Sequence, residues 1–417
     1  MSPRVRNPTY EKYVTGPIER FHESRTIYSM ADRGEVRGFQ SAVDRGLELK
    51  AARRQPGFLR EDFALCLAGR TVDTLLRDTL LCRESQKRRW TIPGDPMEFD
   101  SPSTASTLVK RAALWFGASS AGVTRLDRRW LYSHWGDHYA QHVEGAEPGD
   151  PLVIPDHYTH AVVMAFAMDF ADIQRSPGII PSTDLGYSQQ AYTAVSLAEY
   201  IRMLGYKAIP SGNDMALSIP LAVDAGLGEM GRHGILITRE HGPRVRLSKV
   251  FTDLPLLPDQ PVDLGVQAFC ETCKKCAKYC PARAIPDGDR SDRPRTPSNN
   301  GGVLKWQIDP ARCFDWWYRN GTVGCANCIR TCPWNKPKGL SHSLVHGLIA
   351  RTTGANAALV KLDDAFGYGR QVIRATPTLG TYLPAWSRRG AVARAPNEDA
   401  TSVSDYPEQS PERGEGA

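Results

Sequence analysis

Apolar residues recur at helical spacing over the first part of the chain, between charged positions. Phe63, Cys66 and Leu67 stand among Arg and Asp residues there, and apolar residues three and four positions apart are typical of an amphipathic helix. We therefore expect residues 1–95 to form a mainly helical cover. Cys66 and Cys82 take apolar positions in this pattern, where a free Cys packs as a small hydrophobic residue.

From about residue 100 the pattern changes to helices that alternate with short apolar runs. The run from His160 to Met168 is almost wholly apolar and is bounded by polar residues, which predicts a buried strand. Such alternation indicates layers of helix on sheet over residues 96–255. Each predicted helix is followed by a glycine placed to end it. The other elements expected here are helices over 103–116 and 191–204 and strands over 206–210 and 234–238.

Cysteines dominate residues 256–340, which we interpret as a separate small module. Pro, Gly, Asp and Asn residues over 286–302 mark an exposed loop within it. Residues 341–387 are expected to pack on the core. Residues 388–417 are too polar to bury a face, so we expect a disordered tail there.

Composition and charge indicate an ordinary globular protein. The 417 residues are enough for two or three domains of roughly 100–200 residues each. Of these residues, 41% are apolar and 24% are charged. The net charge of +6 is scattered along the chain, which argues against a nucleic-acid partner.

The N-terminus has no apolar segment after its basic residues, so neither a secretory signal nor a twin-arginine leader is visible. No run approaches the ~18 uninterrupted apolar residues that a membrane span needs. We therefore expect a cytoplasmic protein without a membrane span, periplasmic only if a twin-arginine leader was removed.

Ten cysteines sharpen this picture, because eight of them fall between positions 270 and 332. Such clustering in a long chain without a signal is typical of metal ligation rather than of disulfides. The first motif, C-x2-C-x2-C-x3-C-P, is the bacterial ferredoxin run for a 4Fe–4S cluster. Its cysteines are Cys270, Cys273, Cys276 and Cys280.

A second motif keeps the last three positions and lacks the first, for which Cys313 is the expected replacement. In two-cluster ferredoxins the fourth Cys of a motif ligates the other cluster. One predicted ligand set is therefore Cys270, Cys273, Cys276 and Cys332, and the other is Cys280, Cys313, Cys325 and Cys328. Zinc also binds C-x2-C pairs, but the two C-x3-C-P endings are not zinc spacings, so we favour two 4Fe–4S clusters.

Two one-electron carriers side by side form an electron path that has to end at a reaction centre. No G-x-G-x-x-G or P-loop is present to bind a nicotinamide, a flavin or a nucleotide. The D-x-H-x-x-G run of cobalamin proteins that supply a His ligand is absent as well. The residues alone therefore indicate a two-cluster oxidoreductase and do not name its substrate.

The segment from Gly186 to Pro281 resembles the reductive dehalogenases, which are corrinoid and iron–sulfur enzymes that remove halide from organohalides. The likeness rests on LGYSQQAYTAVSLAEYIRMLGYKAIPSGND, AVDAGLGEMGR and VRLSKVFTDLPL, followed by the cluster motifs. The resemblance implies an α+β fold, in which a nitroreductase-like domain binds base-off cobalamin. A bacterial-ferredoxin-like domain would bind the two 4Fe–4S clusters.

The resemblance also implies which residues act. Tyr187 takes the proton-donor position, with Asn213 and Arg246 beside it in the substrate pocket. The reaction is R–X plus two electrons and a proton, giving R–H and halide. A phenol is a poor acid, with an ordinary pKa of about 10, so a guanidinium that stabilises the phenolate favours proton release. The Asn213 amide can hold the phenol or contact the halogen without adding charge.

Three glycines of AVDAGLGEMGR, Gly226, Gly228 and Gly231, are expected to let the backbone approach the tail or edge of the corrinoid; a loop of tight turns is the alternative. Read singly, the three pocket residues also have ordinary explanations. Tyr187 could fill a gap before a helix, Asn213 could form a turn and Arg246 could face solvent on a strand.

Two other functions fit part of the pattern. An epoxyqueuosine-reductase-like enzyme shares corrinoid, clusters and architecture but acts on a modified tRNA base, and the incomplete second motif counts against it. A non-catalytic iron–sulfur electron-transfer module would bind no corrinoid. We expect instead a dehalogenase with a catabolic or detoxifying role, which takes a small organohalide and is fed by a separate low-potential donor of the ferredoxin or flavodoxin type.

Overall fold

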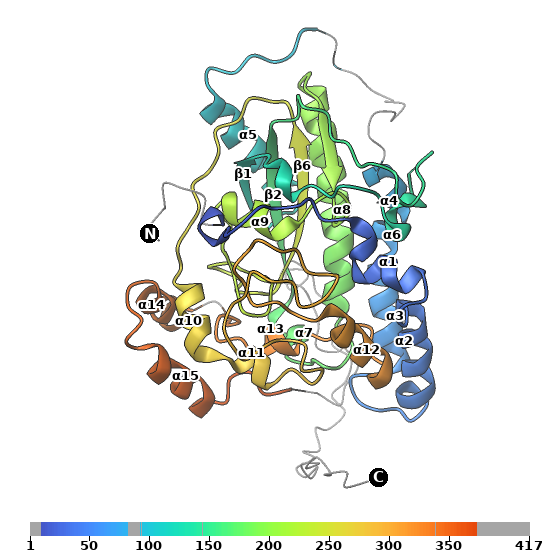
Figure 1. Cartoon of the computed structure of the whole chain (residues 1–417), viewed down its shortest axis with the longest axis vertical. Helices are drawn as coiled ribbons and strands as arrows, with labels where there is room; N and C mark the ends of the chain where they lie inside the picture. Colours follow the sequence, from blue (N-terminus) through green and yellow to red (C-terminus); the bar gives the residue numbers. More distant parts are fainter. Residues whose placement is uncertain (1–9, 82–91, 93, 144, 338, 373–417) are drawn as a thin grey trace, which may run out of the picture.

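The computed structural model describes residues 10–372 except 82–91, 93, 144 and 338. Its centre is a four-stranded antiparallel sheet in the order β1-β2-β6-β3. The strands are β1 (Ser120–Arg125), β2 (His160–Ala167), β6 (Val245–Thr252) and β3 (Ala208–Ser211). Figure 1 shows the sheet in the upper half of the molecule, beside the long helix α8. The mixture of helix and sheet confirms the predicted α+β class.

Helices surround this sheet and continue below it, as Figure 1 shows. The N-terminal helices are α1 (Ile27–Asp32), α2 (Phe39–Gly46), α3 (Arg60–Gly69) and α4 (Thr71–Leu81). The helices between these and the cysteine module are α5 (Pro102–Trp115), α6 (Asp137–Ala140), α7 (Phe170–Ile173), α8 (Pro181–Met203) and α9 (Ser218–Asp224). The helices of the cysteine module and beyond are α10 (Val266–Cys273), α11 (Lys275–Lys278), α12 (Pro310–Asn320), α13 (Asn327–Arg330), α14 (Leu340–Ile349) and α15 (Asn356–Ala365).

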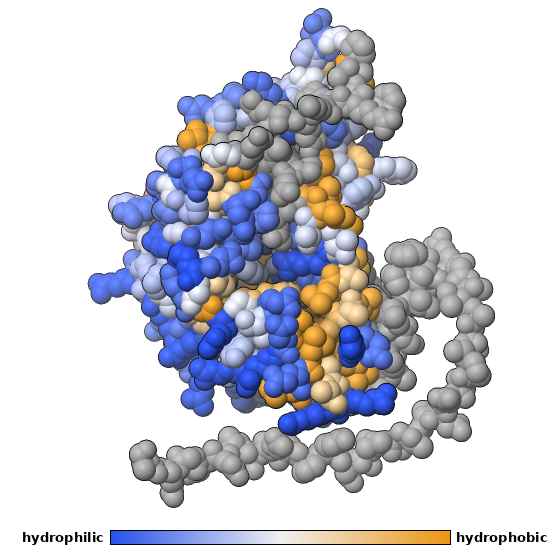
Figure 2. Space-filling view, turned by 90° about the vertical axis from the view of Figure 1, so that its right-hand side faces the viewer, coloured by the Kyte–Doolittle hydropathy of each residue, from blue (hydrophilic) through white to orange (hydrophobic). Residues whose placement is uncertain are grey.

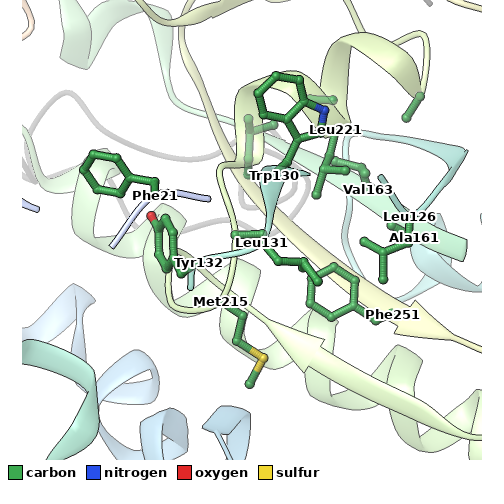
Figure 3. Close-up of a cluster of buried hydrophobic side chains, with 14 of the residues drawn as sticks. Phe21, Leu126, Trp130, Leu131, Tyr132, Ala161, Val163, Met215, Leu221 and Phe251 are labelled. Carbon is green, nitrogen blue, oxygen red and sulfur yellow. The ribbon is translucent and has the colours of Figure 1, made fainter. Parts of the chain in front are cut away.

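Strand β2 is buried on both faces, because helices and loops cover the sheet on either side. Val162 and Met164 pack with residues of α5 and α8. Val163 belongs to the opposite face and to the cluster that contains Trp130 and Leu131, drawn in Figure 3. The buried strand predicted for this run is confirmed. Because the sheet is covered on both faces at β2, side chains on both sides of this strand are buried, and this explains its unbroken apolar sequence.

Helix α8 begins at Pro181, well before the helix that the hydrophobic pattern predicted over 191–204. The first half of α8 buries polar side chains, among them Asp184 and Ser188. Ser188 Oγ donates to the Gly69 carbonyl at 2.6 Å, so its polar group is satisfied inside the protein. A pattern built on apolar residues misses a buried helical face that is polar. Tyr187 therefore lies within a helix and not in a gap before one.

Two predicted strands also differ from the structure. The main-sheet strand expected over 206–210 is β3, which spans Ala208–Ser211. The strand expected over 234–238 reduces to β5 (Leu236–Ile237), which pairs with β4 (Glu229–Met230) in a separate two-stranded sheet. Gly234 has a φ of +71°, and this left-handed conformation breaks the extended backbone before β5.

The cysteine module lies below the sheet in Figure 1, with α14 and α15 at its outer side. Ile349 from α14 packs with Phe269 and Trp334 of the module, so the segment after residue 340 contacts the module. The 286–302 loop contains no helix or strand and is only partly exposed, since Asn299 within it is buried. Cys82 and the predicted tail lie outside the described residues. The predicted domain boundaries stay predictions.

Figure 2 shows the face that carries the N-terminal helices on the right of Figure 1. Hydrophilic residues cover most of this face, and hydrophobic ones gather towards its lower right. Within the described ranges, no helix is both long enough and apolar enough to cross a membrane.

The core of the sheet predicts a large effect of truncating Phe251. This ring is fully buried on β6, so Phe251→Ala leaves a cavity and is expected to lower the free energy of unfolding by about 3–5 kcal/mol. Leu75→Ala is the control, because Leu75 is 73% exposed and a change there is expected to stay within about 0.5 kcal/mol. Urea unfolding at equal cofactor loading measures both. Equal midpoints for the two variants would contradict the core assignment.

Candidate active site and cluster ligands

The structure brings the eight clustered cysteines together as two neighbouring groups of four. Cys276 interacts electrostatically with Cys270, Cys273 and Cys332. Cys328 interacts in the same way with Cys280, Cys313 and Cys325. Cys276 and Cys328 also interact with each other, so the groups adjoin. We call Cys270, Cys273, Cys276 and Cys332 the first thiol group, and Cys280, Cys313, Cys325 and Cys328 the second.

Both thiol groups fit an iron–sulfur cluster chemically. Burial raises the pKa of Cys273 to about 11 and that of Cys270 to about 12. Thiols this buried become thiolates when a cation compensates their charge, and the irons of a cluster supply that cation. Within the described residues, no three His, Cys, Asp or Glu side chains are placed to hold one metal ion.

The first thiol group is shielded by aromatic and charged side chains. Cys270 and Cys332 pack in one cluster with Trp306 and Trp334. Arg232 Nε donates to the Cys270 carbonyl at 3.1 Å, and the guanidinium lies 4.4 Å from the centroid of the Trp306 ring. Salt bridges from α15 close the outer side, because Asp363 pairs with both Lys275 and Lys336.

The second thiol group opens onto a cavity of about 1170 Å³, which we call the central cavity. All four of its cysteines line this cavity. Tyr187, Arg246, Tyr28 and Arg70 line it as well. The central cavity therefore joins the second thiol group to Tyr187 and Arg246, two of the three residues that the sequence placed in the substrate pocket.

Two guanidinium groups lie close to the ring of Tyr187 at the wall of the central cavity. The Cζ atom of Arg246, from β6, lies 4.6 Å from the centroid of the Tyr187 ring, and that of Arg70 lies 4.4 Å from it. Gly186 makes room for the first of these contacts, because a Cβ there would come within 3.0 Å of Arg246 Cγ. Tyr187 itself is only 8% exposed. Two cations at this range stabilise negative charge on a phenol.

Sequence reasoning missed Arg70, which follows α3 in the N-terminal cover. Arg70 Nη1 lies 3.3 Å from Asp184 Oδ1, and Arg70 Nε lies 3.4 Å from Asp73 Oδ2. Cys66 Sγ donates to the other oxygen of Asp184 at 2.8 Å. These contacts hold the Arg70 guanidinium against Tyr187. No motif marks Arg70, since it occupies an ordinary polar position beside an amphipathic helix.

Asn213 lies in a smaller polar cavity of about 440 Å³ that also contains Tyr187. Its loop is held by Lys249, which is fully buried on β6. Lys249 Nζ donates to Ser218 Oγ at 3.0 Å, to the Ala216 carbonyl at 3.3 Å and to the Gly212 carbonyl. Burial lowers the pKa of Lys249 to about 8. The sequence signal that could have identified the role of Lys249 is its position beside apolar residues in VRLSKVFT, where a lysine is unexpected.

A third cavity of about 1190 Å³ adjoins these two, and we call it the outer cavity. It shares Arg246 with the central cavity and Asn213 with the polar one. Most of its wall is apolar, but Arg246 Nε, Gln190 Oε1 and Asn300 Nδ2 are buried without a hydrogen-bond partner among the described residues. Apolar walls with unmet polar atoms fit a large cofactor such as a corrinoid.

Tyr28 on α1 was also missed, and it lines all three cavities. The charge of Tyr187 and burial raise the pKa of Tyr28, and the nearby Arg70 and Arg246 oppose this rise. Sequence reasoning had no signal for Tyr28, because α1 is short and far from any motif.

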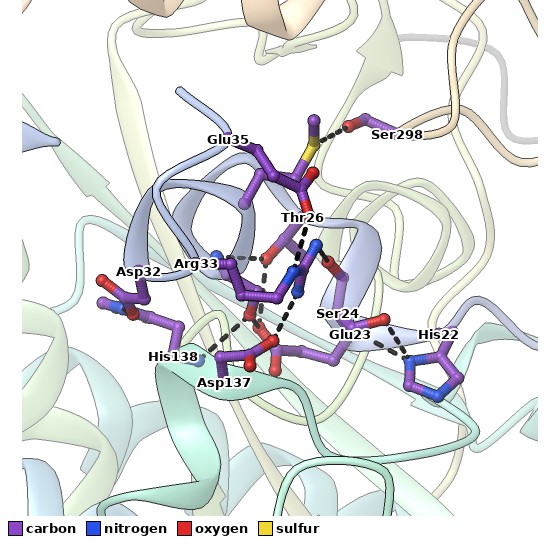
Figure 4. Close-up of polar contacts among 12 residues, drawn as sticks. His22, Glu23, Ser24, Thr26, Asp32, Arg33, Glu35, Asp137, His138 and Ser298 are labelled. Carbon is purple, nitrogen blue, oxygen red and sulfur yellow. Dashed lines mark hydrogen bonds and ion pairs between the residues drawn. The ribbon is translucent and has the colours of Figure 1, made fainter. Parts of the chain in front are cut away.

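A polar network fixes the position of α1, and Figure 4 shows it. The buried Glu23 carboxylate accepts hydrogen bonds from Thr26 Oγ1 at 3.0 Å and from Ser29 Oγ at 2.9 Å. Arg33 pairs with Asp137 on α6. These bonds tie the N-terminal segment to the body of the protein independently of Tyr28.

The three glycines expected near the corrinoid are packed against the chain itself. A Cβ at Gly228 would lie 2.1 Å from the Ile237 carbonyl oxygen, and one at Gly226 would lie 2.5 Å from that of Gln260. A Cβ at Gly231 would lie 2.7 Å from a side-chain carbon of Ile237. None of the three lines the cavities described above. Internal packing therefore explains these glycines, and their contact with a corrinoid stays a prediction.

Comparison with known proteins adds to this geometry. Residues 269–335 match the family model described as a 4Fe-4S double cluster binding domain. The tetrachloroethene reductive dehalogenase of Sulfurospirillum multivorans is 34% identical over 413 residues, which cover 85% of this chain and 81% of that protein.

Solved structures show the same fold. A catabolic reductive dehalogenase in complex with 3-bromo-4-hydroxybenzoic acid superposes with a TM-score of 0.70 at 23% identity, over 90% of this chain and 50% of the other. A second reductive dehalogenase, whose structure suggests a mechanism for B12-dependent dehalogenation, gives a TM-score of 0.65 at 22% identity, over 90% and 50% of the two chains. The chain thus spans about half the length of these structures.

The two thiol groups predict the iron content of a ligand variant. Cys332→Ala removes one member of the first group, so iron is expected to fall from about eight to about four per chain as one 4Fe–4S cluster is lost. Cys66→Ala is the matched control, because Cys66 is a buried thiol that donates a hydrogen bond to Asp184 and belongs to neither thiol group. This variant is expected to keep the full iron content. Iron analysis after anaerobic purification measures both. Full iron in Cys332→Ala would exclude Cys332 as a ligand.

Proposed function

The chain belongs to the reductive dehalogenase family, and from that premise we propose that it removes halide from an organohalide by using a corrinoid and two 4Fe–4S clusters. The observation that carries this proposal is the central cavity. Tyr187, with two guanidinium groups over its ring, lines this cavity together with the four cysteines of the second thiol group. A proton donor and an electron source on one cavity are the two requirements of reductive dehalogenation.

The outer and central cavities are the proposed site of the corrinoid. Apolar side chains such as Leu217 and Leu247 would contact its faces, while Ser218, Gln190 and Asn300 offer polar groups to its amides. When bound, the corrinoid delivers to the carbon–halogen bond the two electrons that the clusters supply singly. The side chains around it exclude water and position the substrate next to Tyr187.

Tyr187 is the proposed proton donor. Its O–H bond breaks as a C–H bond forms at the carbon that loses halide, which balances R–X plus two electrons and a proton against R–H and halide. Arg246 and Arg70, which both lie close to its ring, would stabilise the phenolate left behind. Asn213 shares the polar cavity with Tyr187 and can hold the phenol or the halogen through its amide.

The partners follow from the same reaction. A small organohalide is the substrate that the cavities admit, and a separate ferredoxin or flavodoxin-type protein is the proposed electron donor. The expected cytoplasmic location and the expected lack of a nucleic-acid partner stay predictions.

Metal analysis tests the proposed cofactors first. Expression with cobalamin and anaerobic purification are expected to give about one cobalt and about eight irons per chain, as one corrinoid and two 4Fe–4S clusters require. Full iron without cobalt would reduce the protein to an electron-transfer module. Turnover of an epoxyqueuosine-containing tRNA, with none of any organohalide, would identify the tRNA-modifying enzyme instead.

Replacement of Tyr187 tests the proton donor. Tyr187→Phe is expected to keep cobalt and iron but to slow organohalide turnover at least about tenfold, because the phenolic proton is lost. Tyr192→Phe is the matched control on the same helix, since Tyr192 is 52% exposed, and it is expected to turn over like the unaltered protein. Halide release with a chemical reductant measures both. Unchanged turnover in Tyr187→Phe would remove Tyr187 from the mechanism.

A further inference from the structure

Lys305 is a partly buried cation whose charge is not compensated by the residues that the structure describes. Its Nζ donates a hydrogen bond to Asn300 Oδ1, which is a neutral acceptor. Burial lowers the pKa of Lys305 to about 8, and no acidic side chain of the described residues opposes this shift. Taking an ammonium group out of water without an anion to compensate it is costly. An anion from outside the chain would supply that compensation.

Asn300 connects Lys305 with the outer cavity, because it lines that cavity. The Asn300 amide oxygen accepts from Lys305, so the amide nitrogen is the group left for another partner. This Nδ2 atom is buried and has no hydrogen-bond partner among the described residues. A cation and a neutral donor that both lack an acceptor therefore lie next to each other at one wall of the outer cavity.

Hydrogen bonds fix the loop that presents Asn300. Asn299 Oδ1 accepts from two backbone N–H groups of the same loop, and Asn299 Nδ2 donates to the Ile308 carbonyl at 3.0 Å. Ser298 Oγ donates to the Arg25 carbonyl at 2.7 Å, and Figure 4 shows Ser298 next to the N-terminal segment. A binding group held in this way needs little rearrangement to meet a ligand.

The other charged groups near this wall also favour an anion. The Arg25 guanidinium lies 4.7 Å from the centroid of the Phe21 ring, which lines the outer cavity, and Arg25 Nε is buried without a partner among the described residues. The Glu23 carboxylate is bonded to two hydroxyl groups, and burial raises its pKa to about 7. Asp309 pairs with Arg312. The cations here are therefore less compensated than the acids.

We propose that Lys305 and Asn300 bind the phosphodiester of the corrinoid; this inference rests on the function proposed above. The side chains around a corrin ring end in neutral amides, whereas the loop that joins the ring to its lower base contains a phosphodiester. The phosphate is therefore the peripheral group that matches an uncompensated cation. Hydrogen bonds from an ammonium group to a phosphate are stronger than those between neutral groups. Lys305 thus selects corrinoids that keep their nucleotide loop.

Cobinamide provides the test, because it has the ring of cobalamin and lacks the nucleotide loop with its phosphate. Lys305→Gln removes the charge and keeps a hydrogen-bond donor. We expect this variant to bind cob(II)alamin at least about tenfold more weakly, while the dissociation constant of cob(II)inamide stays within about twofold of the unaltered value. Both corrinoids are titrated by visible absorbance into the full chain, purified anaerobically with its clusters and without corrinoid.

A second variant and a control accompany this measurement. Asn300→Asp is expected to weaken cobalamin alone as well, because its carboxylate would pair with Lys305 and repel the phosphate. Lys50→Gln is the matched control, since burial also lowers the pKa of Lys50 to about 8 and Lys50 lines none of the three cavities. It is expected to bind both corrinoids like the unaltered protein.

The remaining outcomes contradict the assignment. Unchanged cobalamin binding in Lys305→Gln would show that Lys305 does not hold the phosphate, and equal weakening of both corrinoids would show that it serves the ring. If the unaltered protein binds cobalamin but not cobinamide, Lys305→Arg has to bind cobalamin more tightly than Lys305→Gln, and equal affinities would overturn the inference. In all these cases a corrinoid still binds. If the unaltered protein binds neither corrinoid, the proposed function itself fails and the inference falls with it.

Discussion

The contact of one tyrosine ring with two arginines joins parts of the chain that lie far apart in sequence. Tyr187 comes from α8, Arg246 from the central sheet and Arg70 from the N-terminal cover. Each partner must be placed to within an ångström or so for the cations to act on the phenol. The sheet, the long helix and the cover therefore have to assemble as one body before the proposed proton donor and its two arginines meet.

Burying these cations requires acidic partners, and this explains why the first half of α8 is polar. Asp184 on α8 and Asp73 on α4 compensate the charge of Arg70. A buried charge without a partner is costly, so removing either member of a buried ion pair strongly destabilises the protein. The first half of α8 is thus polar because the site needs polar side chains there. The same polar side chains interrupt the apolar spacing by which a helix is predicted from sequence.

The two thiol groups occupy different surroundings, which gives the proposed clusters different tasks. The second group opens onto the central cavity that Tyr187 lines. The first group is packed among Trp306 and Trp334 and is closed from outside by the α15 salt bridges. Solvent exclusion and nearby charge both change the potential of an iron–sulfur cluster. In the proposed function, the second group is the cluster site next to the cavity, and the first group is the more distant site, which electrons reach earlier.

The sequence by itself determined what depends on spacing along the chain. The C-x2-C-x2-C-x3-C-P run, together with the incomplete second motif and Cys313, implied two clusters and their exchange of a cysteine. The apolar run from 160 implied a buried strand. All of these signals are spacings along the chain. Tyr187, Asn213 and Arg246 followed from motifs that resemble a known family. Tyr28, Arg70 and Lys249 were decided only by the tertiary structure. Their roles depend on contacts between segments that are far apart in the sequence. Such contacts produce no regular spacing of residues, so the sequence pattern does not reveal them.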